Sequence, residues 1–321
     1  MEIILSIDGG GSKLSAVLFD SKFQLLGRGI SSGVNTNHTS LEDSRTNVVN
    51  CLNQVFSGKS KIHIDRLYVV FVGPVRILYE ELAKYATVGE RVILGEARAG
   101  LLASAMRKEG ILALAGTGSD VFYLRNEPAL NSLVGAWGPI LGDQGSGTWI
   151  GQKALQAVVA AFEGWGKQTM IYELIRREWK LKTKTDLIHI IHKSIAPFRT
   201  VASVTPLVGK AACAGDSVAL QILRDAGLFM AIQTDCLISR QNIPEEYRYV
   251  VCCGGAWKAH PAMFTSFYEQ LQKLYPGIHV EKPWFEHVMA GPVSEIIRKQ
   301  IPVEEAKKIL SVQFPDYVIK W

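Results

Sequence analysis

The sequence predicts an α/β protein made of two similar halves. Predicted strands alternate with predicted helices along the chain, which is typical of the α/β class. Two predicted hairpins with glycine-rich tips, at residues 3–19 and 111–124, lie about 110 residues apart, and a repeat of this kind suggests a duplicated domain. At 321 residues the chain is long enough for two packed cores.

The first hairpin has three consecutive glycines at its tip. Ile3 to Ile7 predicts a strand, Asp8 to Lys13 a tight turn, and Leu14 to Phe19 the returning strand. Because glycine has no Cβ, the backbone N–H groups of this turn can come close to a phosphate. The pattern favours a phosphate-binding loop, with an ordinary β-turn as the alternative. The second hairpin repeats it, with Gly116 to Ser119 as the turn.

Hydrophobic periodicity places the remaining elements. Between the hairpins it predicts helices at 40–56, 77–85 and 97–108 and strands at 66–72 and 92–94. After the second hairpin it predicts helices at 147–162, 169–179 and 186–194 and a long helix from the N-cap Asp216 to about Ile238. A buried strand at 249–253 then ends in Gly254-Gly255.

Charge and composition argue against several other classes of protein. The net charge is only +5, and Lys and Arg are scattered, so we expect no nucleic acid partner. Apolar runs fall short of the roughly 20 residues that span a bilayer, and the N-terminus lacks a secretory signal. The five cysteines form no CxxC pair. We therefore expect a soluble, cytoplasmic protein with reduced thiols and no membrane partner.

Two familiar nucleotide motifs do not fit the sequence. Gly58-Lys59-Ser60 resembles the end of a Walker A loop, but position 53 is Asn53 rather than glycine, and no strand precedes it. No G-x-G-x-x-G stretch follows a predicted strand, so the sequence lacks the motif that would indicate a dinucleotide-binding fold.

The stretch from Gly135 to Gly151 is the most informative. It places Asp143 among several glycines, close to Trp137 and just before a predicted helix. Such a segment is costly to order unless a ligand or a metal uses the carboxylate. It therefore predicts a binding loop, with a flexible loop as the alternative.

Taken in order, these motifs resemble the N-acetylglucosamine kinase group of the BadF/BadG/BcrA/BcrD ATPase family. The likeness runs over nearly the whole chain, and six motifs in sequence are specific where one would be weak. The first phosphate motif is matched by Asp8 to Ser12, the sugar loop by Asn35 to His38, the second phosphate motif by Gly116 to Ser119, the tryptophan–glycine and aspartate–glycine–serine signature by Trp137 to Gly151, the entry to the long helix by Thr205 to Val208 with Gly215-Asp216, and the adenosine motif by Gly254-Gly255.

The resemblance implies a fold and its cofactors. It implies two duplicated ribonuclease H-like lobes of the actin/hexokinase-type ATPase fold, with ATP bound in the cleft between them. The lobes would cover residues 1–113 and 114–321, and a helix near Gly291-Pro292 would return to the first lobe. ATP and Mg²⁺ are the implied cofactors, and a small-molecule amino sugar is the implied substrate. A homodimer is left open.

The resemblance also implies residue roles in phosphoryl transfer, where positioning and charge stabilisation supply most of the rate. Asp8 and Asp143 count as catalytic residues suited to hold Mg²⁺ through water, since Mg²⁺ prefers oxygen ligands and keeps much of its hydration. The nucleotide would contact Gly10, Gly11, Ser12, Lys13, Thr117, Gly118, Gly254 and Gly255. The sugar would contact Asn37, Ser119, Ala136, Trp137 and Asp143.

Glu96 is the candidate catalytic base, and it departs from the family pattern. Relatives have Asn-Asp where this chain has Gly95-Glu96, and that Asp accepts the proton of the attacking hydroxyl. A glutamate can do the same, but it is longer by one methylene, and near-attack geometry tolerates little displacement. Gln144 also departs, because it stands where relatives usually have Glu.

Four functions are left open. The first is an N-acetylglucosamine kinase that forms the 6-phosphate, and the second is a kinase of glucosamine, N-acetylmuramic acid or another hexose. The third is an activator ATPase of a 2-hydroxyacyl-CoA dehydratase, whose iron–sulfur cluster needs cysteines at helix starts; Cys213 and Cys236 lie inside predicted helices instead. The fourth is a non-catalytic sugar or nucleotide sensor, suggested by Glu96 and Gln144.

Overall fold

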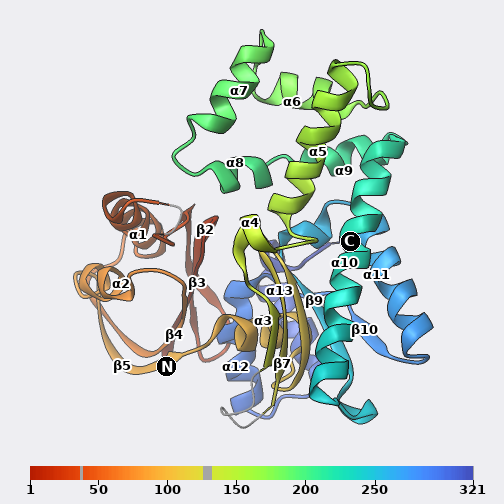
Figure 1. Cartoon of the computed structure of the whole chain (residues 1–321). Helices are drawn as coiled ribbons and strands as arrows, with labels where there is room; N and C mark the ends of the chain where they lie inside the picture. The colour runs from red at the N-terminus through yellow and green to blue at the C-terminus, as the bar shows by residue number, and fades with distance from the viewer. Residues whose placement is uncertain (37–38, 126–131, 321) are drawn as a thin grey trace. The chain divides into compact units, whose positions relative to one another are not determined.

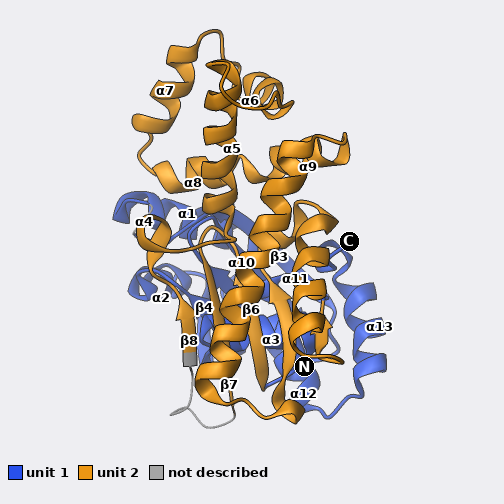
Figure 2. Ribbon diagram, turned by 45° about the vertical axis from the view of Figure 1, so that its right-hand side comes forward, with its two compact units in different colours: residues 1–108, 282–320 blue, residues 109–281, 321 orange. Residues whose placement is uncertain are grey.

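The computed structural model describes residues 1–36, 39–125 and 132–320 (Figure 1). Internal contacts divide them into two compact units, which Figure 2 colours separately. Unit 1 contains residues 1–108 and 282–320, and unit 2 contains residues 109–281. The lobe boundary placed after residue 113 stays a prediction; the contacts change from one unit to the other between Lys108 and Glu109.

Unit 1 is built on a five-stranded mixed sheet with the order β3-β2-β1-β4-β5. Strands β1, β2 and β3 pair antiparallel, while β4 and β5 run parallel to β1. The strands are β1 (Ile3–Gly9), β2 (Lys13–Asp20), β3 (Leu25–Ser32), β4 (Ile62–Phe71) and β5 (Ala86–Ile93). The helices are α1 (Leu41–Val55), α2 (Val75–Leu82), α3 (Glu96–Ala105), α12 (Ala290–Arg298) and α13 (Val303–Gln313), with 3₁₀ turns η4 (His287–Met289) and η5 (Pro315–Tyr317).

Each face of the first sheet has its own core. Successive side chains of a strand point to opposite faces, and in β1 Leu5 and Ile7 join the core under α1 and α2. Ile4 joins the core formed with α3, α12 and α13. Ser6 and Asp8 share the face of Ile4 by the same period, and the Ser6 hydroxyl donates to the Val288 carbonyl at 2.7 Å. The end of β1 is therefore held against η4.

Unit 2 repeats this design with the sheet order β10-β9-β6-β7-β8. Strands β6, β7 and β8 pair antiparallel, and β9 and β10 run parallel to β6. The strands are β6 (Gly110–Ala115), β7 (Ser119–Leu124), β8 (Ser132–Gly135), β9 (Tyr249–Cys253) and β10 (His279–Glu281). The helices are α4 (Gly138–Leu141), α5 (Gly147–Phe162), α6 (Ile171–Glu178), α7 (Lys184–His192), α8 (Pro197–Ala202), α9 (Thr205–Cys213), α10 (Ser217–Gln241) and α11 (Pro261–Leu274), with 3₁₀ turns η2 (Glu245–Tyr247) and η3 (Gly255–Lys258).

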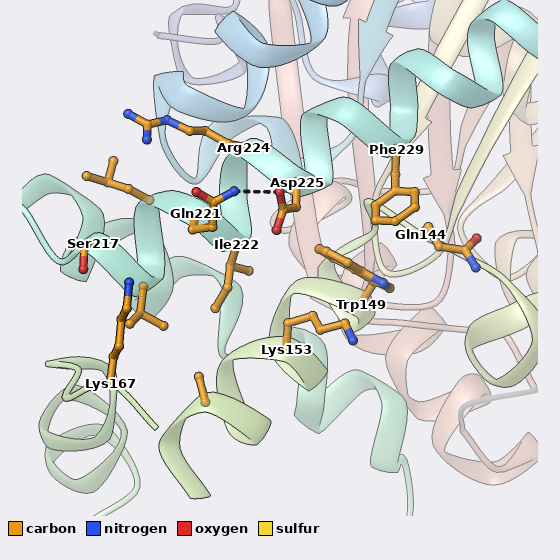
Figure 3. Close-up of a pocket in the computed structure, with 13 residues that line it drawn as sticks. Gln144, Trp149, Lys153, Lys167, Ser217, Gln221, Ile222, Arg224, Asp225 and Phe229 are labelled. Atoms are coloured by element: carbon orange, nitrogen blue, oxygen red, sulfur yellow. Dashed lines mark hydrogen bonds between the residues drawn. The ribbon is translucent and has the colours of Figure 1, made fainter. Parts of the chain in front are cut away.

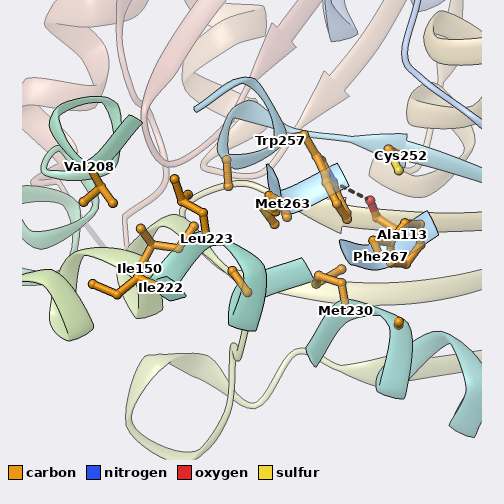
Figure 4. Close-up of a cluster of buried hydrophobic side chains, with 14 of the residues drawn as sticks. Ala113, Ile150, Val208, Ile222, Leu223, Met230, Cys252, Trp257, Met263 and Phe267 are labelled. Carbon is orange, nitrogen blue, oxygen red and sulfur yellow. Dashed lines mark hydrogen bonds between the residues drawn. The ribbon is translucent and has the colours of Figure 1, made fainter. Parts of the chain in front are cut away.

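A single large core fills unit 2 between its sheet and the helices α5, α9, α10 and α11. Figure 4 shows Trp257 and Phe267 packed there, with ring centroids 5.0 Å apart. The Trp257 indole also donates to the Ala113 carbonyl at 3.1 Å, so its one polar atom is satisfied where the side chain is fully buried. This contact fixes η3 against β6.

The two sheets have the same strand order and the same strand directions when β6 to β10 are matched with β1 to β5. This confirms the predicted α/β class and the predicted duplication. Within the described ranges, none of the helices is both long and apolar enough to cross a membrane.

Candidate active site

The tip of the first hairpin offers open backbone at the end of β1. Gly10 donates to the Lys13 carbonyl at 3.0 Å and accepts from the Val34 amide at 2.9 Å, which fixes the turn. No heavy atom lies within 4 Å of the place where a Cβ of Gly10 would be. The turn therefore has room for a ligand beside its main chain, as a phosphate loop requires.

Asp8, the last side chain of β1 before this turn, lies against a histidine from the C-terminal part of unit 1. Its Oδ1 atom is 3.2 Å from His287 Nδ1, and His287 Nε2 is 3.0 Å from the Glu96 carbonyl oxygen. Both partners are hydrogen-bond acceptors, so both ring nitrogens donate only when the imidazole is a cation. Burial alone would lower the pKa of His287, but the charge and hydrogen bond of Asp8 outweigh it and raise this pKa above its ordinary value.

Glu96 is the first residue of α3, directly after the N-cap Gly95. Part of Glu96 is exposed to solvent, yet the surrounding protein raises the pKa of its carboxyl group above the ordinary value. The Asp8 charge raises the same pKa further, and the His287 charge opposes both effects. Glu96, Asp8 and His287 thus form one electrostatic group, and a carboxyl group with a raised pKa is a stronger base once it is ionised.

Lys13 pairs with Glu286 at 2.8 Å, and the side chains of the pair are 40% and 24% exposed. An ion pair with this much exposure contributes little stability. Lys13 can therefore exchange Glu286 for a phosphate at small cost.

The turn of the second hairpin is fastened to the start of α5. The Gly147 amide donates to the Gly116 carbonyl at 2.8 Å, and the Thr148 hydroxyl donates to the Thr117 carbonyl at 2.7 Å. Helix α5 begins there because Ser146 caps it, accepting from the Trp149 amide at 3.0 Å. The turn and the helix start form one rigid support.

Asp143 lies against this support as a buried carboxylate. A Cβ on Gly118 would lie 2.8 Å from Asp143 Oδ2, so the carboxylate of Asp143 can come this close to the turn only because residue 118 is glycine. Asp143 has a left-handed φ of 59° and is 6% exposed. Burial raises the pKa of its carboxyl group, although hydrogen bonds from the Ser119 and Gly138 backbones lower it. An unusual backbone conformation and a raised pKa at one buried acid are typical of functional sites.

Gly254 and Gly255 follow β9 at the same edge of the sheet. A Cβ on Gly254 would lie 2.4 Å from the Ala115 carbonyl oxygen, and its φ is +104°, so only glycine fits. Gly255 has open space where its Cβ would be. Since β6 and β9 are parallel, the adenosine candidate and the second phosphate candidate meet at their carboxyl ends.

The sugar candidates of unit 2 lie beside Asp143. The Ser119 hydroxyl is buried and donates to the Gln144 carbonyl at 3.0 Å, and the Ala136 amide donates to the Ser119 carbonyl at 3.3 Å. Trp137, which precedes α4, is 72% exposed. It presents an aromatic face that a sugar ring could cover. Asn37 lies outside the described residues.

His287 is the functional candidate that sequence reasoning missed. It lies in no motif, and it is 279 positions from Asp8 in the sequence.

The structure shows no preformed metal site for the ion proposed at Asp8 and Asp143. The described part of the chain contains no group of three or more His, Cys, Asp or Glu side chains that could hold an ion. Asp8, with open glycine backbone nearby at Gly10, still fits a hydrated Mg²⁺ bound with a nucleotide, because Mg²⁺ takes few protein ligands in such sites.

The chain resembles known proteins along most of its length. The sequence profile of the BadF/BadG/BcrA/BcrD ATPase family matches residues 5–284. An N-acetylmuramic acid/N-acetylglucosamine kinase from Clostridium acetobutylicum is 26% identical over 288 residues, which cover 87% of this chain and 94% of the relative.

Two solved structures share the fold. A candidate N-acetylglucosamine kinase from Chromobacterium violaceum superposes with a TM-score of 0.65 at 18% identity, covering 92% of this chain and 99% of that one. A ROK family glucokinase from Streptomyces griseus, solved with glucose and AMPPNP, gives 0.61 at 13% identity, covering 93% and 99%. These likenesses confirm the predicted two-lobed ATPase fold.

Proposed function

The chain belongs to the BadF/BadG/BcrA/BcrD ATPase family, and we propose that it is a cytoplasmic ATP-dependent kinase that converts N-acetylglucosamine to its 6-phosphate. One observation carries the proposal: each unit sets a buried carboxylate beside a glycine-rich turn, Asp8 in unit 1 and Asp143 in unit 2. Phosphoryl transfer needs little more from a protein than phosphate-holding backbone and correctly placed charge.

The glycine-rich backbone supports the nucleotide roles, with open space beside Gly10 and Gly255. Gly10, Gly11, Ser12 and Lys13 hold phosphate groups in unit 1, and Thr117 and Gly118 do so in unit 2. Gly254 and Gly255 receive the adenosine, because neither has a side chain and Gly255 has open space beside it. ATP supplies the phosphoryl group, and Mg²⁺ held by Asp8 and Asp143 through water offsets its charge.

The sugar roles follow from the groups around Asp143. Its carboxylate accepts hydrogen bonds from sugar hydroxyls, Ser119 and Ala136 border the ring, and the exposed Trp137 covers an apolar face. Asn37 is assigned to the sugar by family likeness. A sugar that replaces water around the buried Asp143 gains from each hydrogen bond more than it would in bulk solvent.

Glu96 accepts the proton of the attacking hydroxyl. Its raised pKa makes it a stronger base than an ordinary glutamate, provided that it is ionised at the working pH. The helix start favours the ionised form. His287, which donates to Asp8 and to the Glu96 backbone, acts as a positioning residue that fixes α3 relative to the end of β1.

N-acetylmuramic acid is the second candidate substrate, because the relative from Clostridium acetobutylicum carries both sugars in its name. The exposed apolar surface formed by Trp137, Ile140 and Leu141 would suit the methyl group of that sugar's lactyl ether, although not its carboxylate. The activator function is disfavoured by Cys213, the last residue of α9, and Cys236, inside α10, since neither lies at a helix start.

An acceptor screen tests the proposal. ATP consumption is measured with N-acetylglucosamine, N-acetylmuramic acid, glucosamine and glucose, and the phosphorylated carbon is identified by NMR. We expect the highest kcat/KM with N-acetylglucosamine and phosphate on C6. The D143N variant, purified identically, serves as the control for contaminating kinases. Nucleotide binding without turnover of any sugar would overturn the kinase proposal and favour a sensor.

A further inference from the structure

Unit 2 contains a large pocket beside α5, on the face of this helix that bears Trp149 and Lys153. We infer that this pocket is a second ligand site, which binds a sugar phosphate. The pocket lies between one face of α5 and the first half of α10 (Figure 3). Its volume is about 830 Å³. Pockets that bind small molecules typically range over roughly 300–1,000 Å³, so a hexose phosphate fits with room to spare.

The pocket is separate from the candidate active site. Helix α5 lines it with Trp149, Lys153 and Ala157, which repeat every four residues and so share one face of the helix. The preceding residue Thr148 belongs to the other side, where it holds the Thr117 carbonyl. None of the described nucleotide and sugar candidates lines the pocket.

The charge of the pocket favours an anion. Lys153, Lys167 and Arg224 line it, and within residues 1–36, 39–125 and 132–320 none of these three side chains forms an ion pair. The lining contains one carboxylate, Asp225, which already accepts from the Gln221 amide at 2.8 Å. The printed partners of Lys153 are neutral: its Nζ donates to the Gln156 side chain at 3.4 Å and lies 5.7 Å from the centroid of the Trp149 ring. Three cations without counter-ions around one cavity favour an anionic ligand, such as a phosphate monoester with up to two negative charges.

The neutral groups favour a sugar as the rest of the ligand. Trp149 is only half-buried and packs edge-to-face on Phe229, with ring centroids 5.4 Å apart, which fixes the orientation of its indole. A rigid aromatic face accepts the C–H face of a pyranose, which here would have to displace the Lys153 ammonium, 5.7 Å from the ring centroid, or use the other face of the ring. Gln144 and Ser217 line the same pocket and offer amide and hydroxyl groups for sugar hydroxyls. Figure 3 shows Lys167 extending toward Ser217, away from the Trp149 end.

A ligand in this pocket would act on Asp143 through Gln144. Gln144 lines the pocket, and its backbone carbonyl accepts from the Ser119 hydroxyl at 3.0 Å and from the Gln233 side-chain amide at 2.8 Å. A ligand that moves Gln144 therefore changes the loop that carries Asp143. The ligand class is that of the proposed product, so the pocket would serve feedback control. This regulatory effect rests on the proposed function, whereas the binding itself does not.

Isothermal titration calorimetry with N-acetylglucosamine 6-phosphate tests the site. The variant K153E/K167E reverses two exposed cations of the pocket, and K193E/K273E reverses two exposed cations that do not line it. We expect pocket binding to weaken at least about tenfold in the first variant and to remain unchanged in the second. Inorganic phosphate and N-acetylglucosamine alone are titrated as further probes, and each should bind more weakly than the sugar phosphate.

The outcomes separate this proposal from the kinase proposal. If both proposals hold, the parent protein binds two equivalents of N-acetylglucosamine 6-phosphate, one in the pocket and one in the active site. The K153E/K167E variant then retains only the equivalent in the active site. If only the pocket exists, the parent binds one equivalent, which K153E/K167E loses. Binding that survives the double reversal in full, or that falls equally in K193E/K273E, would overturn the site. Inorganic phosphate binding as tightly as the sugar phosphate would overturn recognition of the sugar.

Discussion

The two units hold the carboxylates beside their glycine-rich turns in opposite ways, although the two sheets share one topology. In unit 1, Asp8 lies beside the imidazole of His287. The two hydrogen-bond acceptors of this imidazole, Asp8 and the Glu96 carbonyl, both favour its cationic form. In unit 2, Asp143 forms no ion pair with any described residue, and its charge is supported only by backbone N–H groups. The two carboxylates do not come from equivalent positions of the repeat, since Asp8 lies in β1 whereas Asp143 lies in the loop between α4 and α5. Unit 1 gives its carboxylate a counter-charge, and unit 2 leaves its carboxylate without one among the described residues.

The largest effect is expected from the proposed base. E96Q keeps the size of Glu96 but removes its ability to take a proton, so kcat should fall by about 10² to 10⁴, while the KM for the sugar changes little. Steady-state kinetics with saturating ATP measure both values. E96D is the matched control and should keep substantial activity, because it restores the residue type of the relatives. Parental kcat in E96Q would remove Glu96 from this role.

Asp8 should combine a kinetic effect with a structural one. D8N removes the proposed Mg²⁺ partner, so turnover should fall by about a hundredfold or more. It also removes the counter-charge of His287, and we therefore expect a lower Tm and a lower pKa of His287, followed by NMR. A D8N protein with parental turnover at saturating Mg²⁺ would show that Asp8 has no part in the reaction.

Asp143 should give the same kinetic loss without the structural one. D143N should lower turnover by about a hundredfold or more, because it removes charge and acceptor capacity next to the proposed sugar and metal. Its Tm should stay level or rise, since burial penalises the native carboxylate and the amide has no charge to bury. A drop in Tm as large as that of D8N would contradict the difference between the units.

Sequence patterns located both hairpins and most helices because these signals are local. Strand β3 was not predicted, since Gly27 and Gly29 weaken its pattern; both are needed because a Cβ at either position would lie 2.3 Å or less from a carbonyl oxygen of α1. Helices α11 and α13 were also missed. Pro261 and Pro302 look like breakers, yet they stand at the helix starts, where proline is well tolerated.

The site was predictable only in part, for a related reason. Asp8, Asp143 and the paired glycines lie in short motifs that family likeness makes recognisable, and their roles stay predictions. His287 lies in no such motif and meets Asp8 only because residues 282–320 belong to unit 1. The pocket beside α5 was not foreseen either, because its cations come from three separate segments.

The last comparison sets Asp143 against a structural carboxylate of unit 1, Glu295. Glu295 is 1% exposed, and it accepts from Arg66 at 2.5 Å, from Arg298 at 2.8 Å and from the Tyr68 hydroxyl at 2.8 Å. Burial would raise the pKa of Glu295, but these partners outweigh it and hold the pKa below its usual range. Removing one member of a buried ionic network costs roughly 3–5 kcal/mol, so E295Q should be clearly destabilised at neutral pH.

Lowering the pH should bring the stabilities of E295Q and D143N toward that of the parent, from opposite sides. The lowered pKa of Glu295 means that its contribution is complete above the unfolded pKa, about 4.3, and is lost as the pH falls through the folded pKa. The raised pKa of Asp143 means that its ionised form costs stability above the folded pKa, and this cost disappears below the unfolded pKa of about 3.9. Urea unfolding between pH 7 and pH 3.5 should therefore show E295Q approaching the parent from below and D143N approaching it from above or staying level. If D143N lost stability that acid restored, Asp143 would be a structural carboxylate like Glu295.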